Sequence, residues 1–375
     1  MRKNRGLPFG SPSSFQIFKY AGVFCGCVFL DIYRIIRYNY IDKVLCRNIV
    51  KQVIIIKTIK IKFADFFQGF NLEDNFLLRA MKKNYNVIQC DDPDYLIFSC
   101  FGDENLKYDK CIKIFYSGED VCPDFNLCDY GISFDDIKYE DRYLRYPLFS
   151  IWGMDKAMQK HIFTEDEIEA KTEFCNFVVS NGNANPIRLE FFEKLSKYKQ
   201  VLSGGKFMNN IGGPVVDKAA FQEKFKFTIA FENDMSNGYT SEKILDAFKA
   251  KTIPIYWGNK NIVYDFNPKS FINVNDFSSI DEAIDYIKEI DNNDDLFRKI
   301  LSEPIFENGE LPYKFSADAL ADFFAYIIEQ PLDKAKRLSK YSFKGYYLHK
   351  QLSKARYEKL MCENICYRLL HKIIK

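Results

Sequence analysis

The alternation of apolar and polar positions divides most of this chain into two series of strands and helices. In the first series, residues 58–66 alternate as in a strand, and residues 72–84 have the apolar spacing of a helix. Short apolar runs, separated by turns rich in Asp, Pro and Gly, follow at 86–90, 95–100 and 111–116. Buried runs of this kind predict the strands of a parallel sheet.

A second series begins near residue 174 and repeats the arrangement. Residues 174–180 and 227–231 are apolar runs, and residues 187–198 have helical spacing. The other predicted elements are a short strand near Val201, strands at 252–257 and 271–274, and a helix that a capping box at 279–282 opens and that runs through Ile290. Two such series in tandem predict an α/β protein with two doubly wound domains that face a cleft.

Residues 227–258 concentrate polar side chains where a helix begins between two strands. Thr240 and Ser241 are candidate N-caps, and Glu242 falls in the first turn. The N-terminus of such a crossover helix directs free N–H groups and the positive end of its dipole toward a ligand above the sheet. Lys243 at this position indicates an anionic ligand, most simply a diphosphate. A surface lysine on an ordinary crossover helix is the alternative.

The same segment carries a family pattern. Its residues FENDMSNGYTSEKI (231–244) and IPIYWG (253–258) resemble the donor motif of the α-1,3-fucosyltransferases of glycosyltransferase family 10, above all that of the bacterial members. Thr240 and Ser241 replace a Val-Thr pair of the family, which keeps a hydroxyl group at the expected cap. The resemblance spans roughly residues 55–330 and includes, in the family's order, residues 115–135, 141–148, 180–188 and 265–277.

This resemblance implies the GT-B architecture, in which two Rossmann-like domains face a cleft. The expected parts are an uncertain N-terminal extension (1–50), an acceptor-binding domain (51–155), a GDP-fucose-binding domain (156–331) and a basic amphipathic tail (332–375). The implied reaction is the inverting transfer of L-fucose from GDP-β-L-fucose to O3 of GlcNAc in N-acetyllactosamine-type glycans, which gives Lewis-type products.

Inverting displacement of GDP requires a group that removes a proton from the acceptor hydroxyl as it attacks. Glu119 is the best candidate, because it lies just past a predicted strand of the first domain, where ligands meet an open α/β sheet. The matching glutamate of the resembling enzymes is the proposed base. Asp120, the next residue, is the rival carboxylate, and a solvated loop acid is the structural alternative.

The charge on the departing diphosphate requires cations on the opposite side. Arg188 starts a predicted helix, so its guanidinium and the helix N-terminus can address a phosphate together, and Lys243 is the second cation. The expected donor contacts are Arg188, Lys243, Asn233, Tyr239, Glu242 and Glu232. Glu232 either contacts the donor or holds Lys243 in place. Tyr256 and Trp257 are interpreted as packing residues of the last strand.

Histidine and metal-ligand patterns narrow the chemistry. The chain has three histidines, none of them in these motifs, which argues against a Ser-His-Asp triad or a His-built zinc site. No Asp-X-Asp metal motif follows a strand in the donor half, and the acidic pairs at 91–92 and 135–136 are interpreted as ordinary turn acids. We therefore expect no obligatory metal, with Mn²⁺ or Mg²⁺ at most stimulating by shielding released GDP.

Charge and cysteine usage bear on location and partners. A net charge of +2 argues against a general nucleic-acid binder, and eleven cysteines without a CxxC pair indicate reduced thiols in a reducing compartment. The tail (332–375) carries twelve Lys or Arg against three Asp or Glu, which favours peripheral binding at the cytoplasmic face of the inner membrane; a solvated helical tail is the alternative. The apolar stretch at 21–30 is short for a membrane span, so 1–50 is interpreted as a cytoplasmic extension or a mis-called start, with a weak anchor as the alternative.

Two other functions remain open. One is a GT-B glycosyltransferase that uses another nucleotide sugar, against which the donor motif argues. The other is a non-catalytic glycan-binding relative, against which the joint presence of Glu119, Arg188 and Lys243 argues. The choice between α-1,3 and α-1,4 linkage depends on loops of the acceptor domain.

Overall fold

The computed structural model describes residues 56–152 and 161–339, together with residues 347, 351, 354, 355, 358, 359 and 362. The chain divides into two units, Met1–Ile56 and Lys57–Lys375, and both sheets lie in the second unit. The expected N-terminal extension (1–50) and most of the expected tail fall outside the described residues. No helix in the described part of the chain has both the length and the apolar character needed to span a membrane.

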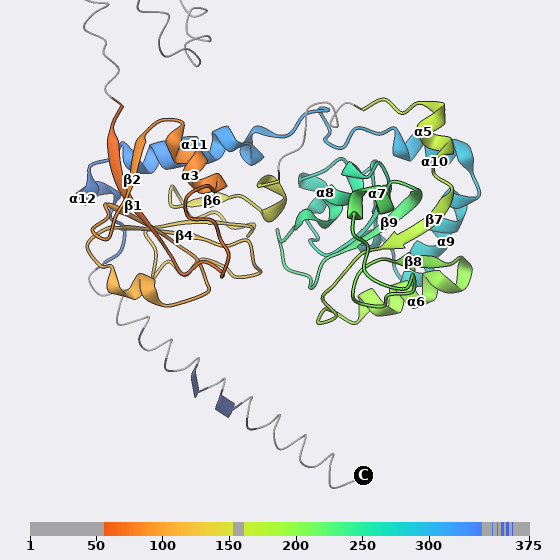
Figure 1. Ribbon diagram of the computed structural model, residues 1–375, viewed down its shortest axis with the longest axis horizontal. Helices are drawn as coiled ribbons and strands as arrows, with labels where there is room; N and C mark the ends of the chain where they lie inside the picture. Colours follow the sequence, from red (N-terminus) through yellow and green to blue (C-terminus); the bar gives the residue numbers. More distant parts are fainter. Residues whose placement is uncertain are drawn as a thin grey trace, which may run out of the picture. The chain divides into compact units, whose positions relative to one another are not determined.

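The first sheet is built from the first series of apolar runs (Figure 1). Its strands lie in the order β2-β1-β3-β4-β5-β6 and all pairs are parallel, so the carboxyl ends share one edge. The predicted strands are confirmed, whereas β5 and β6 have no counterpart in the sequence pattern because glycine and polar residues interrupt these short runs. The bounds are β1 (Thr58–Ala64), β2 (Asn86–Gln89), β3 (Tyr95–Phe98), β4 (Ile112–Tyr116), β5 (Tyr130–Ser133) and β6 (Tyr143–Arg145).

Two helices that are distant in sequence cover one face of the first sheet (Figure 1). α3 (Phe76–Lys82) and α11 (Ala317–Ile328) pack together and share a core with β1, β3, β4 and β5. α12 (Leu332–Ala335) contributes Ala335 to this core. On the opposite face, irregular segments surround Phe98 and Phe115.

The position of α11 corrects the expected domain boundaries. The expected second domain (156–331) includes α11, yet Leu320, Phe324 and Ile327 of this helix are buried with α3 and the first sheet. Asp318 also accepts a hydrogen bond from Lys83 at 2.7 Å. The apolar face of a helix predicts that it is buried but not against which sheet. The prediction that placed this helix in the second domain, from the order of elements along the chain, is therefore wrong.

The second sheet reverses its strand order at one point. Its order is β11-β10-β9-β7-β8 and all pairs are parallel. β7 is followed in sequence by its neighbour on one side, β8, and then by its neighbour on the other side, β9. This reversal is the topological switch point, where open α/β sheets bind ligands beyond their carboxyl ends. The bounds are β7 (Glu173–Phe177), β8 (Val201–Ser203), β9 (Phe225–Phe231), β10 (Ile253–Trp257) and β11 (Ile272–Asn273).

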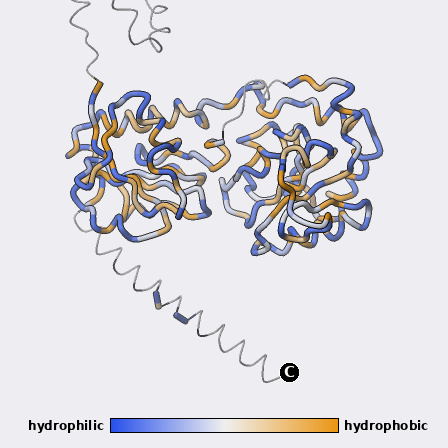
Figure 2. Tube along the Cα trace, in the orientation of Figure 1, coloured by the Kyte–Doolittle hydropathy of each residue, from blue (hydrophilic) through white to orange (hydrophobic). Residues whose placement is uncertain are grey.

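Helices cover both faces of the second sheet (Figure 1). α6 (Ile187–Tyr198), α9 (Ile280–Asp291) and α10 (Asp294–Leu301) share one core with β7, β9 and β10, and α8 (Glu242–Lys249) packs on the other face. Figure 2 shows hydrophobic positions concentrated along the strands of both sheets. The predicted fold class, an α/β protein of the GT-B type with two parallel sheets, is confirmed.

Helix caps explain where several of these helices begin. Ser241 caps α8, as predicted, and its hydroxyl accepts a hydrogen bond from the backbone N–H of Lys243. Ser279 caps α9, but the carboxylate of Glu282 accepts from the N–H of Ser278, so the predicted capping box is only half formed. The remaining elements are α5 (Glu165–Glu169), α7 (Lys218–Gln222), and the 3₁₀ turns η2 (Glu104–Lys107), η3 (Leu148–Ser150), η4 (Ile262–Tyr264), η5 (Val274–Asp276) and η6 (Tyr313–Phe315).

Candidate active site

Arg188 lies at the switch point of the second sheet, in the first turn of α6. Its guanidinium donates to the carbonyl oxygens of Asn181 (3.1 Å) and Phe231 (3.3 Å) and to Oδ1 of Asn233 (2.6 Å). These residues follow or end β7 and β9, the two strands that flank the switch point. The predicted contact residues Arg188 and Asn233 are thus brought together.

The charge of Arg188 is buried among neutral partners. The residue is 1% exposed, and its Nε–H has no hydrogen-bond partner among the described residues. Burial lowers the pKa of the guanidinium, while the charge of Glu232 acts in the opposite direction. None of the hydrogen-bond partners of Arg188 neutralises its positive charge, which lies at the switch point where open α/β sheets bind ligands.

Glu232 follows β9 and organises the start of α8. Its fully buried carboxylate accepts hydrogen bonds from the backbone N–H of Ser241 (2.7 Å), the hydroxyl of Ser241 (2.7 Å) and Nζ of Lys243 (2.9 Å). Of the two roles expected for Glu232, the structure shows the one of holding Lys243. Lys243 also donates to the hydroxyl of Ser241 at 3.0 Å, so its ammonium group is fixed at the N-terminus of α8.

Glu119 lies in the loop that follows β4 of the first sheet. Its backbone N–H donates to the hydroxyl of Ser117, and that hydroxyl bonds to its carbonyl oxygen, each at 3.1 Å. Its side chain lies in the exposed part of the loop. The rival carboxylate, Asp120, accepts a hydrogen bond from the hydroxyl of Ser236 at 2.7 Å. The backbone of Glu119 is therefore held while its side chain is accessible.

Tyr239 lies between the donor-motif residues of the second sheet and the first sheet, which carries Glu119. Its ring packs edge-on against Phe134, with centroids 5.1 Å apart, and the residue is buried. Burial raises the pKa of the Tyr239 hydroxyl, and the negative charges of Glu232, Glu119, Asp120 and Glu242 raise it further. These carboxylates come from both sheets. The loop of Glu119 and the donor-motif loop lie side by side, because Ser236 bonds to Asp120, next to Glu119, and Tyr239 packs on Phe134.

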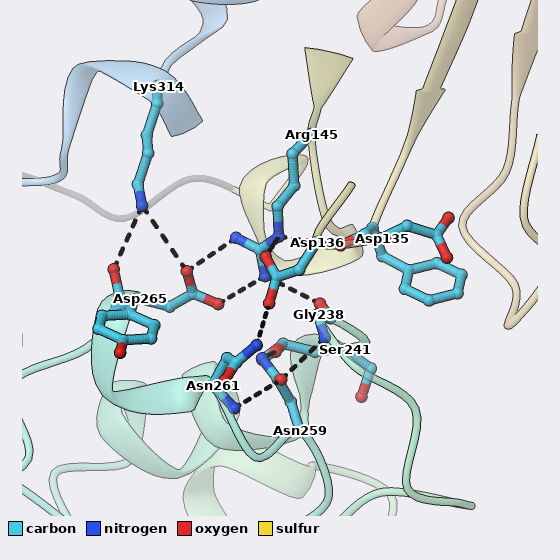
Figure 3. A network of polar contacts seen from close by, with 12 residues as sticks. Asp135, Asp136, Arg145, Gly238, Ser241, Asn259, Asn261, Asp265 and Lys314 are labelled. Atoms are coloured by element: carbon cyan, nitrogen blue, oxygen red, sulfur yellow. Dashed lines mark hydrogen bonds and ion pairs between the residues drawn. The ribbon is translucent and has the colours of Figure 1, made fainter. Parts of the chain in front are cut away.

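Arg145, at the end of β6, is a polar centre that the sequence did not indicate (Figure 3). Its guanidinium binds the carboxylate of Asp265 through two hydrogen bonds of 2.8 Å each. Its Nε lies 2.8 Å from Oδ1 of Asp136 and 2.9 Å from the carbonyl oxygen of Phe134. It also donates to the carbonyl oxygen of Gly238, in the loop of the donor motif, at 2.9 Å.

The interpretation of residues 135–136 as ordinary turn acids is wrong. Asp135 is 6% exposed and burial raises its pKa, and Asp136 bonds both to Arg145 and, at 2.7 Å, to the side-chain amide of Asn261. Asp91 does belong to the predicted type, because it is an exposed acid paired with Lys62. An adjacent acidic pair does not reveal partners that lie more than a hundred residues away in the sequence.

Tyr256 and Trp257 are packing residues, as predicted. Both are buried, at 0% and 5% exposed, and the hydroxyl of Tyr256 accepts a hydrogen bond from the backbone N–H of Asn259. Within the described part of the chain, no group of three or more His, Cys, Asp or Glu side chains is arranged to hold a metal ion. Arg188 and Lys243 are the cations at the starts of α6 and α8.

Two family models match this chain, one over each sheet. Residues 61–152 match the family described as Alpha-(1,3)-fucosyltransferase FucT N-terminal domain, and residues 168–302 match Glycosyltransferase family 10 (fucosyltransferase) C-term. The boundary between the two matches falls between the two sheets.

Individual relatives give the extent of the similarity. The Alpha-(1,3)-fucosyltransferase FucT of Helicobacter pylori is 34% identical over 269 residues, which cover 62% of this chain and 56% of that protein. The 4-galactosyl-N-acetylglucosaminide 3-alpha-L-fucosyltransferase 9 of Mus musculus is 33% identical over 135 residues, 35% of this chain and 37% of that protein. The chain thus spans less than two thirds of either relative.

A solved structure is covered almost completely. The crystal structure of an alpha1,3-fucosyltransferase with GDP-fucose has a TM-score of 0.64 and 30% identity, and the match covers 73% of this chain and 91% of that chain. The motifs, the two parallel sheets and these matches agree. The chain belongs to glycosyltransferase family 10, the fucosyltransferases.

Proposed function

We propose that this protein transfers L-fucose from GDP-β-L-fucose to O3 of GlcNAc in N-acetyllactosamine-type glycans, with inversion at the fucose carbon and Lewis-type products. The observation that carries the proposal is the contact of the loop with the accessible carboxylate of Glu119 and the donor-motif loop, through the hydrogen bond from Ser236 to Asp120 and the packing of Tyr239 on Phe134. The Helicobacter pylori relative is named for α-1,3-fucosyl transfer, and an alpha1,3-fucosyltransferase of similar structure has been solved with GDP-fucose. The name of the mouse relative supports a galactosyl-N-acetylglucosamine acceptor.

The donor diphosphate binds beyond the switch point of the second sheet. Arg188 supplies a guanidinium whose hydrogen-bond partners are all neutral, and the positive end of the α6 dipole adds to its charge. Lys243 adds a second cation at the N-terminus of α8, where Glu232 keeps it in place. Asn233, Tyr239 and Glu242 complete the donor contacts. Together the cations stabilise the negative charge that develops on GDP as it leaves.

Glu119 is the general base. A sugar hydroxyl is a poor nucleophile at neutral pH, so a carboxylate on the attack side must remove its proton. Glu119 comes from the acceptor-binding half, whereas the phosphate-binding cations come from the donor half. Attack and departure on opposite sides of the fucose carbon is the arrangement that inversion requires.

We expect no obligatory metal, and binding at a membrane surface. The cations of the chain serve the diphosphate, so Mn²⁺ or Mg²⁺ is at most stimulating. The basic tail (332–375) supports peripheral binding to an anionic membrane surface on the cytoplasmic side. The protein is proposed to bind GDP-fucose and a glycan acceptor, and no nucleic acid.

A donor panel tests the proposed donor. The purified protein is incubated with N-acetyllactosamine and either GDP-fucose, GDP-mannose or UDP-galactose, and release of the nucleoside diphosphate is measured. We expect release with GDP-fucose alone. Release with another donor would establish the alternative glycosyltransferase, and binding of the glycan without release from any donor would establish a non-catalytic relative.

A further inference from the structure

The loop of the donor motif, residues 234–241, is fastened to the first sheet at several points. The hydroxyl of Ser236 donates to Asp120, next to Glu119. The carbonyl oxygen of Gly238 accepts from Arg145, and that of Thr240 accepts from the backbone N–H of Phe149 at 3.4 Å. Every one of these partners follows or ends a strand of the first sheet. The loop with the donor residues is therefore positioned by the half that carries Glu119.

At Gly238, the donor-motif loop lies very close to the backbone of the first sheet's loop. The φ angle of Gly238 is +83°, and a β-carbon added there would lie 2.3 Å from the carbonyl oxygen of Phe134 and 2.9 Å from the backbone nitrogen of Asp136. Its own N–H donates to Oδ1 of Asn259 at 2.8 Å. A side chain would require both a left-handed backbone conformation and a displacement of backbone atoms. Gly238 thus sets how closely the two loops approach.

Arg145 fixes the junction between the donor-motif loop and the first sheet through its charged guanidinium. Its side chain is 16% exposed and that of Asp265 is 1% exposed, so the paired hydrogen bonds between them are shielded from water. A planar guanidinium alone can bond to both oxygens of Asp265 and also to the carbonyl oxygens of Phe134 and Gly238. The two carbonyl groups belong to opposite sides of the junction. Arg145 therefore connects them through one rigid group.

We propose that Arg145, together with Gly238, is a positioning residue for the transfer reaction: it holds the donor-motif loop at the distance from Glu119 that lets the base reach an acceptor bound beside the donor. Arg145 has no contact with Arg188 or Lys243 among its hydrogen bonds and ion pairs. Its loss should therefore alter the alignment of base and donor more than the binding of the diphosphate. This inference rests on the proposed function.

Three variants separate positioning from binding. Arg145→Lys keeps a positive charge next to buried Asp265 but removes the planar fork. Gly238→Ala opens the junction from the other side. Gly309→Ala is the matched control, because Gly309 also has a positive φ (+65°) but a β-carbon there would meet no atom within 4 Å. Gly238→Ala and Gly309→Ala make the same substitution at a positive φ. Only Arg145→Lys and Gly238→Ala act on the contact between the donor-motif loop and the first sheet.

The readouts are the Kd for GDP-fucose, kcat for transfer, hydrolysis of GDP-fucose without acceptor, and hydrogen exchange of residues 234–241. In Arg145→Lys and Gly238→Ala, we expect a Kd within about threefold of wild type, kcat at least about tenfold lower, and the ratio of transfer to hydrolysis lower by a similar factor. Hydrogen exchange of the loop should accelerate in both variants. Gly309→Ala should match wild type in every readout.

Two results would overturn the proposal. One is unchanged kcat and unchanged loop exchange in folded Arg145→Lys and Gly238→Ala. The other is a rise in Kd that accounts for the whole loss of activity while the ratio of transfer to hydrolysis stays constant, which would place Arg145 in the donor site. If wild type itself transfers no fucose, the proposed function fails, and accelerated loop exchange in the two variants still tests the junction.

Discussion

Glu119 and Asp120 are adjacent carboxylates with different surroundings. Glu119 is anchored through its backbone to Ser117 and has an accessible side chain, whereas the carboxylate of Asp120 bonds to Ser236. Glu119→Gln removes the basic group with little change of volume, so we expect kcat to fall by about 10² to 10⁴-fold while GDP-fucose still binds. Asp120→Asn keeps an oxygen that can accept from Ser236, and should cost less than about tenfold in kcat.

Steady-state transfer assays and calorimetric titration with GDP-fucose give both quantities. Retained turnover in Glu119→Gln, together with a large loss in Asp120→Asn, would transfer the role of base to Asp120.

Lys243 is both a proposed phosphate contact and the partner of buried Glu232. Lys243→Ala should weaken binding of GDP-fucose by about tenfold or more and lower kcat as well. It also leaves the carboxylate of Glu232 buried without its cation, which destabilises the fold. The double variant Lys243→Met with Glu232→Gln removes both charges, so it should recover stability without recovering donor binding.

Titration calorimetry with GDP and thermal melts distinguish the two effects. Lys249→Ala, in the last turn of the same helix, is the control and should bind GDP as wild type does. Normal GDP binding by the double variant would show that Lys243 is a structural residue.

At the level of elements, the carboxylate of Glu167 stabilises α5. Glu167 caps the helix at Thr164 and pairs with Lys251, in the turn that follows α8. The hydrogen bond from Lys251 is the main reason why the pKa of Glu167 is lowered from 4.5 to about 2. Because the folded-state pKa is lower than the unfolded one, this stabilisation is complete above pH 4.5 and is lost as the pH falls toward 2.

Glu167→Gln should therefore lower Tm at pH 6 and have a smaller effect at pH 3.5, in the window between the two pKa values. Thermal melts of both proteins across this range measure the difference. A difference in Tm that does not change with pH would show that the ion pair contributes no stability.

The packing of α11 on the first sheet should contribute strongly to stability. Phe324 is fully buried in the core that α11 shares with β1, β3 and α3. Phe324→Ala should lower the free energy of unfolding by about 3–5 kcal/mol. Denaturant unfolding followed by fluorescence measures this change. A loss below about 1 kcal/mol, typical of an exposed position, would contradict the placement of α11 in this core.

Elements were predictable where local pattern decides them. The four first strands, α6, α8 and its cap at Ser241 follow from apolar runs and capping residues. β5 and β6 were missed because their polar and glycine positions interrupt the runs. The sheet that α11 covers was missed because apolar spacing predicts burial and leaves the partner undetermined.

At the level of the whole molecule, the sequence predicted some residues of the candidate site and missed others. The sequence indicated Arg188, Lys243 and Glu119 through helix starts, strand ends and the family motifs. Arg145 and Asp265 meet across 120 positions of sequence, and no local pattern reports such a pair. Both residues lie in segments that resemble the family, but the resemblance does not indicate which residues they contact.

Inverting transfer from GDP-fucose is the central claim, and analysis of the reaction product tests it most directly. The full chain is incubated with GDP-β-L-fucose and N-acetyllactosamine, with and without EDTA, and the product is examined by NMR for linkage and anomeric configuration. The proposed site predicts fucose α-linked to O3 of GlcNAc, and formation of this product in the presence of EDTA. A β-linked product, or no transfer to this acceptor by folded protein that binds GDP-fucose, would contradict it.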